Sequence, residues 1–283
     1  MWWVLGFLTL SLAGWGTYST WRVLHPERHL LPVPDPLPPH TVQMLTAPDG
    51  IRFDCWLLEA ASPRGTLLLY HGYFANRFQV LGIAEGLRRR GLSTLVPELR
   101  GHGDRPGPCT FGLREVEEAG VILRWVQESS GSAGVPVGLL GLSLGGHVVC
   151  QIAAQHPEIR AVVTDSIYPQ LFPVLRDAIL ERYRVPAFLA RCTWWGLQLA
   201  LRRRLGPRDP EALAARLTCP LLAIQGEADA RVPEAWARVF YERWAGPKAR
   251  WTEPEVMHVG MSAKSLEAYC DRVAAFFTEA LSG

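Results

Sequence analysis

The stretch Gly-Leu-Ser-Leu-Gly-Gly, at residues 141–146, constrains the fold of this chain more than any other. The apolar residues 135–140 before it are typical of a short buried strand, and residues 147–155 after it follow a helical pattern. A strand that ends in Gly-x-Ser-x-Gly and passes directly into a helix is the layout of a nucleophile elbow. Side chains two positions from the serine would collide in such a strained turn, and Gly141 and Gly145 remove them. The pattern predicts that Ser143 stands clear of the sheet with an exposed hydroxyl.

Strand-like and helix-like patterns alternate from residue 40 to the C-terminus. A hairpin is expected first, around Pro48-Asp49-Gly50. The later strands are expected at 66–70, 92–97, 135–142, 161–164, 220–225 and 249–252, and the helices at 79–90, 113–128, 147–155, 234–244 and 265–281. This alternation predicts an α/β fold, with a mostly parallel sheet and helices on both faces. Loops at the carboxyl ends of such strands meet at one edge, where binding sites form.

One segment, residues 166–219, interrupts the alternation and carries only helical patterns, at 171–183, 188–204 and 209–217. Because it follows a strand at the edge where a site is expected, we interpret it as a small helical cap. Its apolar pair Trp194-Trp195 is flanked by arginines. These tryptophans either pack the cap onto the core or form an acyl pocket or membrane-facing patch. Trp194 and Trp195 are therefore candidate substrate-binding residues.

The N-terminal segment has no charged side chain from Met1 to Trp21. We expect residues 1–24 to form a hydrophobic helix that anchors the protein in a membrane; a cleaved signal peptide and a helix lying on the domain are the alternatives. Positive charges after the helix favour a cytoplasmic over an exported catalytic domain. Residues 25–39 are rich in proline and predict an extended linker, so the main domain is expected at residues 40–283.

Composition excludes several classes of protein. The net charge is only +2, without a long run of one sign, which argues against a nucleic-acid partner. None of the 6 cysteines forms a C-x-x-C pair, so neither a zinc site nor a redox motif is indicated, and we expect reduced thiols. No metal or organic cofactor is expected. The oligomeric state is left open.

A serine nucleophile needs a base, and the base needs an acid that orients it. Of the 8 histidines, only His258 lies in an expected sheet-edge loop late enough to follow an acid in the order Ser, Asp, His. Asp229, just past the strand at 220–225, is the expected acid. Glu227 competes locally. Asp165, at the end of the preceding strand, is the more serious alternative.

Two backbone N–H groups would have to stabilise a developing oxyanion. Leu144, the residue after the serine, supplies the first by the geometry of the elbow. The second is expected from the loop after the strand at 66–70, where Gly72 allows a tight bend. Tyr73 is the expected donor and Phe74 the alternative.

Several motifs occur together in this chain: His71-Gly72, Arg100-Gly-His-Gly103, Gly141-x-Ser-x-Gly-Gly146, Gly226-x-x-Asp-x-x-Val-Pro233 and His258. Their order and approximate spacing resemble the α/β-hydrolase superfamily from residue 40 to the C-terminus, and most of all its esterase and serine-aminopeptidase-like branch with a short cap. The resemblance implies that Ser143 is the nucleophile, Asp229 the acid and His258 the base. The cap matches no substrate class.

Two classes of function fit these residues. The first is a serine hydrolase that cleaves carboxylic esters, of small molecules or lipids, through an acyl-enzyme; peptidase, amidase or thioesterase chemistry on the same residues is the alternative. The second is a catalytically silent, membrane-tethered module used for binding. A serine at position 143 disfavours dehalogenase and epoxide-hydrolase chemistry, which resembles an aspartate-nucleophile mechanism.

Overall fold

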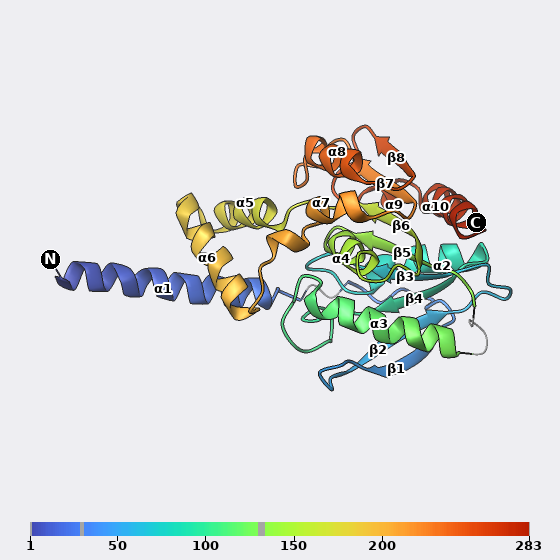
Figure 1. The fold of residues 1–283 in the computed structure, drawn as a ribbon, viewed down its shortest axis with the longest axis horizontal. Helices are drawn as coiled ribbons and strands as arrows, with labels where there is room; N and C mark the ends of the chain where they lie inside the picture. The colour runs from blue at the N-terminus through green and yellow to red at the C-terminus, as the bar shows by residue number, and fades with distance from the viewer. Residues whose placement is uncertain (1, 29–30, 130–133, 283) are drawn as a thin grey trace.

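The computed structural model describes residues 2–28, 31–129 and 134–282. Within these residues the strands form one sheet in the order β1-β2-β4-β3-β5-β6-β7-β8 (Figure 1). The β1–β2 and β2–β4 pairs are antiparallel, and the other pairs are parallel. The strands are β1 (Thr41–Thr46), β2 (Arg52–Leu58), β3 (Thr66–Tyr70), β4 (Ser93–Pro97), β5 (Val137–Leu142), β6 (Ile159–Asp165), β7 (Leu221–Gly226) and β8 (Lys248–Glu253).

Helices cover both faces of the sheet, as expected for the predicted α/β class. One apolar core lies beneath α2 (Phe78–Arg89) and α10 (Leu266–Ser282). The other lies beneath α3 (Leu113–Glu128), α4 (Leu144–Ala153) and α8 (Glu234–Arg243). Strands β3 and β5 are buried at every position, because both of their faces are covered. The predicted fold class is confirmed.

The register of the central strands brings four loops to one edge of the sheet. Tyr70 pairs with Gly141, and Leu142 pairs with Asp165, which in turn pairs with Ile224. The loops that follow β3, β5, β6 and β7 therefore begin side by side at the carboxyl ends of these strands. A short helix, α9 (Met261–Lys264), follows the loop after β8.

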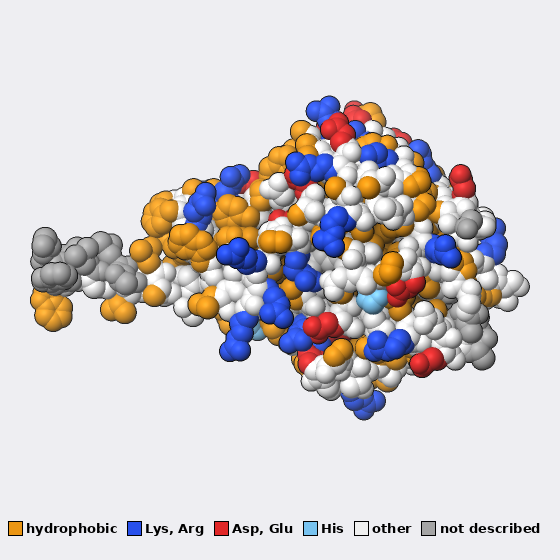
Figure 2. Space-filling view, viewed as in Figure 1, with side chains coloured by type: hydrophobic (Ala, Val, Ile, Leu, Met, Phe, Trp, Pro, Cys, Tyr) orange, Lys and Arg blue, Asp and Glu red, His pale blue; other side chains and the backbone are white. Residues whose placement is uncertain are grey.

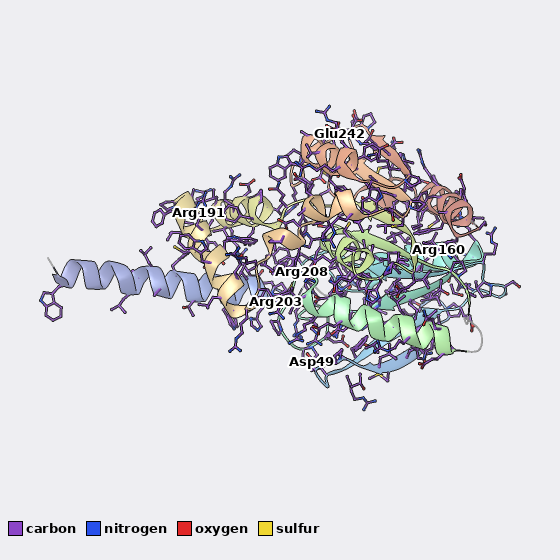
Figure 3. The ribbon with its side chains drawn as sticks, viewed as in Figure 1. Asp49, Arg160, Arg191, Arg203, Arg208 and Glu242 are labelled. Carbon is purple, nitrogen blue, oxygen red and sulfur yellow. The ribbon has the colours of Figure 1, made fainter. Side chains whose placement is uncertain are left out.

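The helical insertion expected after Asp165 lies between β6 and β7. It contains α5 (Leu171–Tyr183), α6 (Ala187–Ala200), η1 (Gly206–Arg208), α7 (Pro210–Leu213) and η2 (Ala214–Arg216). Arg208, labelled in Figure 3, joins this cap to the core, because its Nε donates to Gln151 Oε1 of α4 at 2.9 Å. The buried Asp209 accepts a hydrogen bond from Leu171 N at 3.1 Å, which fixes the start of α5.

The N-terminal helix α1 spans Trp2–Leu24. Within the part of the chain that the structure describes, no helix has the length and apolar character needed to cross a membrane. The predicted membrane anchor at residues 1–24 is therefore wrong, and so is the localisation that depended on it, a membrane-anchored protein with a cytoplasmic catalytic domain. Glycine, serine and threonine interrupt the apolar run of α1, which has no charged side chain before Arg22 in its last turn but is not uniformly apolar.

The C-terminal half of α1 packs against α6 of the cap. Ser19 Oγ and Thr193 Oγ1 lie 2.7 Å apart, and Trp15 Nε1 donates to Leu189 O at 3.1 Å. A Cβ on Gly196 would lie 2.1 Å from Thr20 Oγ1, so only glycine permits this close approach of the two helices. The first part of α1 extends away from the body of the molecule (Figure 1). Residues 25–28 and 31–40, which follow α1, contain neither helix nor strand.

Candidate active site

Ser143 lies at the turn between β5 and α4, with φ 52° and ψ −111°. A Cβ on Gly141 would come within 2.2 Å of the Gly145 carbonyl, and one on Gly145 within 2.1 Å of Tyr70 O. Both glycines are therefore required by close packing around the strained turn, as the sequence indicates. The serine is only 9% exposed, less than expected, because the cap covers this edge of the sheet. It faces a cavity rather than open solvent.

The structure brings Ser143, His258 and Asp229 together in one chain of hydrogen bonds. His258 Nε2 lies 2.9 Å from Ser143 Oγ, and His258 Nδ1 lies 2.7 Å from Asp229 Oδ2. Since an ionised carboxylate only accepts hydrogen bonds, Nδ1 carries the ring proton. Nε2 is left as the acceptor for the serine hydroxyl.

Asp229 is held by donors on both oxygens. Its Oδ1 accepts from the N–H groups of Arg231 and Val232, each at 2.9 Å, and its Oδ2 also accepts from Gln225 Nε2 at 3.0 Å. Burial alone would raise the pKa of this carboxyl, but the hydrogen bond with His258 and the two backbone donors outweigh it and leave the pKa lowered. Asp229 therefore stays ionised and accepts from the imidazole.

The two competing acids lie outside this chain. Asp165 is buried, and its Oδ1 accepts from Ser166 Oγ at 3.0 Å. Burial raises its pKa to about 6, and the hydrogen bond from Ser166 offsets only part of this effect. Ser166 Oγ in turn accepts from Val259 N at 2.9 Å. Asp165 is thus connected through Ser166 to the loop that carries His258. Glu227 is exposed to solvent.

The loop after β3 is fixed directly beside the serine. A Cβ on Gly72 would lie 3.4 Å from Ser143 Cβ, and Gly72 N donates to Gln79 Oε1 at 2.7 Å. The buried His71 ring supports this loop, with its Nε2 2.6 Å from a Glu98 carboxylate oxygen. Leu144 is the first residue of α4, so its N–H has no partner within that helix. Tyr73 lines the same cavity as Ser143.

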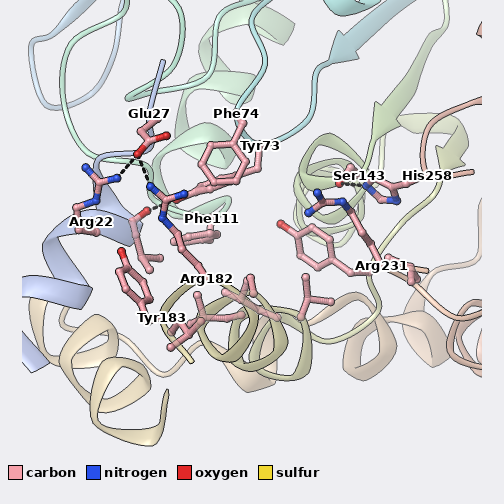
Figure 4. A pocket seen from close by; sticks show the side chains of 18 residues that line it. Arg22, Glu27, Tyr73, Phe74, Phe111, Ser143, Arg182, Tyr183, Arg231 and His258 are labelled. Carbon is pink, nitrogen blue, oxygen red and sulfur yellow. Dashed lines mark hydrogen bonds and ion pairs between the residues drawn. The ribbon is translucent and has the colours of Figure 1, made fainter. Parts of the chain in front are cut away.

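A cavity of about 360 Å³ opens over Ser143 and His258 (Figure 4). Helix α5 forms one wall with Leu171, Leu175 and Ile179, which recur at helical spacing on one face. Phe74 and Phe111 line the cavity as well. This size and apolar lining are typical of a site for a small organic ligand.

The N-terminal segment completes the cavity with Arg22, Val23 and Glu27, which sequence reasoning did not anticipate. Tyr73 Oη donates to Val23 O at 2.6 Å, and Cys109 N donates to Leu24 O at 2.7 Å, so the end of α1 is bonded to the core. These contacts join segments far apart in sequence, and no local pattern announces them. The division of the chain at residue 39 stays a prediction.

Trp194 and Trp195 are absent from the described lining of this cavity. Trp194 packs on Phe172, with 5.4 Å between the ring centroids, and is partly buried against the core. Trp195 is 63% exposed. Figure 2 shows hydrophobic side chains and arginines gathered over the cap. A role of the two tryptophans in substrate binding stays a prediction.

The described residues include no cluster of three histidine, cysteine or acidic side chains arranged to hold a metal ion. The cysteines are free thiols, four of them buried.

A mostly parallel sheet with a strained serine turn at its carboxyl edge, under a helical cap, defines an α/β fold of the hydrolase type. The pattern of the Alpha/beta hydrolase family matches residues 67–277, and the chain belongs to that family.

Its relatives include esterase- and lipase-like proteins. The monoacylglycerol lipase of Mycolicibacterium smegmatis is 26% identical over 246 residues, which cover 69% of this chain and 81% of the lipase. Human protein ABHD12B is 30% identical over 216 residues, 72% of this chain and 57% of that protein. Among solved structures, an esterase of Pyrococcus furiosus superposes with a TM-score of 0.76 at 22% identity, over 92% of this chain and 98% of the esterase. That likeness shows the fold.

Proposed function

We propose that this protein is a serine esterase that cleaves carboxylic esters with apolar acyl groups through an acyl-enzyme. The observation that carries the proposal is the hydrogen-bonded chain from Ser143 through His258 to Asp229, because it opens directly onto an apolar cavity. A serine hydroxyl is a weak nucleophile until a base takes its proton, and this arrangement provides that base.

In the first half of the reaction His258 Nε2 takes the proton of Ser143 Oγ while the oxygen attacks the ester carbonyl carbon. Asp229 holds the ring with Nδ1 protonated and stabilises the imidazolium that forms. When the tetrahedral intermediate collapses, the carbon–oxygen bond to the alcohol breaks and His258 returns the proton to the leaving oxygen. Water then repeats these steps on the acyl-enzyme and releases the acid.

The backbone N–H groups of Leu144 and Tyr73 are the proposed donors to the oxyanion. Leu144 N belongs to the free N-terminus of α4, where the helix dipole also favours negative charge. Tyr73 follows Gly72, whose Cα lies against the serine side chain. Each such preorganised donor lowers the activation free energy by about 3 to 4 kcal/mol.

The apolar lining favours esters over peptides as substrates, because a peptide would bury unpaired amide groups against α5. The names of the relatives, a monoacylglycerol lipase and an esterase, support the same choice. Thioesters also lack an amide N–H, so the same apolar cavity would accept them, and they are the alternative substrates to carboxylic esters.

A fluorophosphonate probe tests the proposal, because it labels an activated serine covalently. We expect labelling at Ser143 in the folded protein and hydrolysis of p-nitrophenyl butanoate. The Ser143→Ala variant should lose at least about a thousandfold in kcat. The matched control is Ser62→Ala, which changes an exposed loop serine and should keep both properties. A wild-type protein without labelling at Ser143, or equal turnover by Ser143→Ala, refutes the proposed function.

A further inference from the structure

The cavity is lined by more positive than negative charge. Three of its described lining residues are arginines: Arg22, Arg182 and Arg231. Glu27 is the acidic residue among the described lining residues. Glu27 forms an ion pair with Arg22 and a second one with Arg182, the latter at 2.7 Å. Figure 4 shows this cluster at the end of the cavity away from Ser143. One carboxylate therefore already serves the two distal guanidinium groups.

Arg231 is different, because no carboxylate among the described residues lies within ion-pair distance of its guanidinium. Its side chain lies at the same end of the cavity as Ser143 and His258 (Figure 4). The root of the side chain is fixed, since Arg231 N donates to Asp229 Oδ1 and the next residue, Val232, is fully buried. An unpaired cation is thus attached directly to the loop that holds the proposed acid.

The chemistry at this end assigns the side of the ester that Arg231 meets. His258 must reach the leaving oxygen to return a proton to it, so the alcohol portion departs beside His258. The acyl chain has the apolar cavity along α5 as its binding surface. Arg231 projects from the loop of Asp229, the partner of His258, so we expect it to meet the alcohol portion rather than the acyl tail.

We propose that Arg231 is a specificity-determining residue, which selects esters whose alcohol portion carries an anionic group, a phosphate or a carboxylate. The inference rests on the proposed esterase function and deepens it. The planar guanidinium offers paired N–H donors that match a phosphate or carboxylate in two-point contact. The preferred substrate is then an amphiphile, with an apolar acyl chain along α5 and an anionic alcohol at Arg231.

Matched substrate pairs test this proposal. Octanoylglycerol 3-phosphate and octanoylglycerol differ in the phosphate alone, and the octanoyl esters of glycolate and glycolamide compare a carboxylate with a neutral amide. All are used below their micellar concentrations. We expect the wild-type protein to cleave at least one anionic ester with about tenfold higher kcat/KM than its neutral match. The preference should shrink as salt is raised, because Arg231 itself is exposed to solvent. The pair that shows the preference identifies the anion.

The variants separate local recognition from net charge. Arg231→Gln should remove the preference, by lowering kcat/KM for the anionic ester to that of its neutral match. Arg231→Lys should restore part of it, since lysine keeps the charge without the planar fork. The control Arg203→Gln removes an equal charge from an exposed position on the cap, outside this cavity, and should keep the wild-type preference (Figure 3).

Two outcomes overturn the inference: a wild-type protein that cleaves both members of each pair equally, or an Arg231→Gln variant that keeps the wild-type preference. Failure of the underlying function gives a different result. In that case the wild-type protein is not labelled at Ser143 and cleaves none of the esters. A protein that is labelled and cleaves neutral esters without charge preference remains an esterase and refutes the role of Arg231 alone.

Discussion

Filling the cavity at Ala178 should shorten the acyl chains that the protein prefers. Ala178 lines the cavity from α5 and is exposed, so Ala178→Trp adds an indole to the cavity without disturbing the core. The cavity volume of about 360 Å³ corresponds to roughly a dozen methylene-sized groups, if each needs about as much room as a water molecule in the liquid.

The expected size of the effect follows from burial of the chain. Each buried methylene contributes about 0.8 kcal/mol, which is about fourfold in kcat/KM. Decanoate has six more methylenes than butanoate, so full burial would favour it by about 5 kcal/mol, or about three and a half orders of magnitude. In Ala178→Trp the indole displaces the far end of the chain. The loss of about four buried methylenes corresponds to about 3 kcal/mol, roughly two hundredfold in kcat/KM for decanoate.

The assay is the kcat/KM profile for p-nitrophenyl esters from butanoate to decanoate, below their micellar concentrations. Leu199→Trp is the matched control, because Leu199 is 80% exposed on α6 and lies outside the cavity. It should keep the wild-type profile, while Ala178→Trp should retain activity on butanoate and lose it on decanoate. The reasoning is refuted if both tryptophan variants give one profile, or if the wild-type rate falls steadily from butanoate upward.

Three further perturbations follow from contacts in the site and the cap. Asp229→Asn should lower kcat by about 10³ to 10⁴, because the imidazole of His258 loses its correct tautomer. The control Glu227→Gln should keep the wild-type kcat. If steady-state kinetics gave the two variants equal kcat values, Asp229 would be excluded as the acid. Asp165 has its pKa raised to about 6 from 3.8, so the folded state binds this proton more tightly than the unfolded chain does. Its contribution to stability is complete below about pH 3.8 and is lost as the pH rises through 6. Between pH 4.5 and 7.5 this loss amounts to about 2 kcal/mol in the wild type, and urea unfolding at these two pH values should show no such loss in Asp165→Asn; parallel pH profiles would contradict the assignment. Gly196→Ala places a Cβ 2.1 Å from Thr20 Oγ1 and should displace α1. It should therefore lower the rate of decanoate hydrolysis more than that of butanoate hydrolysis. The control Gly206→Ala, whose added Cβ would have no atom within 4 Å, should leave the ratio of the two rates unchanged.

The parts of the fold and of the site that could be predicted are those determined by residues adjacent in the sequence or by the general geometry of parallel sheets. The elbow at Ser143 is recognisable because the strand, the two glycines and the helix are adjacent in sequence. Asp229 and His258 follow, since parallel strands bring their carboxyl-end loops to one edge. The ion pair of Glu27 with Arg182 could not be predicted in this way, because it depends on how the N-terminal segment and the cap pack together.

The interpretation of α1 failed for a related physical reason. A largely apolar helix with a single charge in its last turn can be covered by lipid or by protein, and periodicity alone does not distinguish the two. The distinguishing signal was the small and polar side chains Gly16, Ser19 and Thr20 on one face. Ser19 and Thr20 are buried on α6, where a lipid-facing helix would leave their hydroxyls without partners other than their own backbone.

The docking of α1 on the cap has a consequence for how the protein is made. Trp15 and its partner Leu189 are separated by 174 residues along the chain. At typical rates of translation, α1 therefore waits on the order of ten seconds outside the ribosome before α6 has been synthesised. During that interval its apolar side chains have no native surface to cover them, and the cavity beside Ser143 lacks one of its walls. The emerging helix is thus a candidate for chaperone binding, and catalytic competence is among the last properties that a newly made molecule acquires.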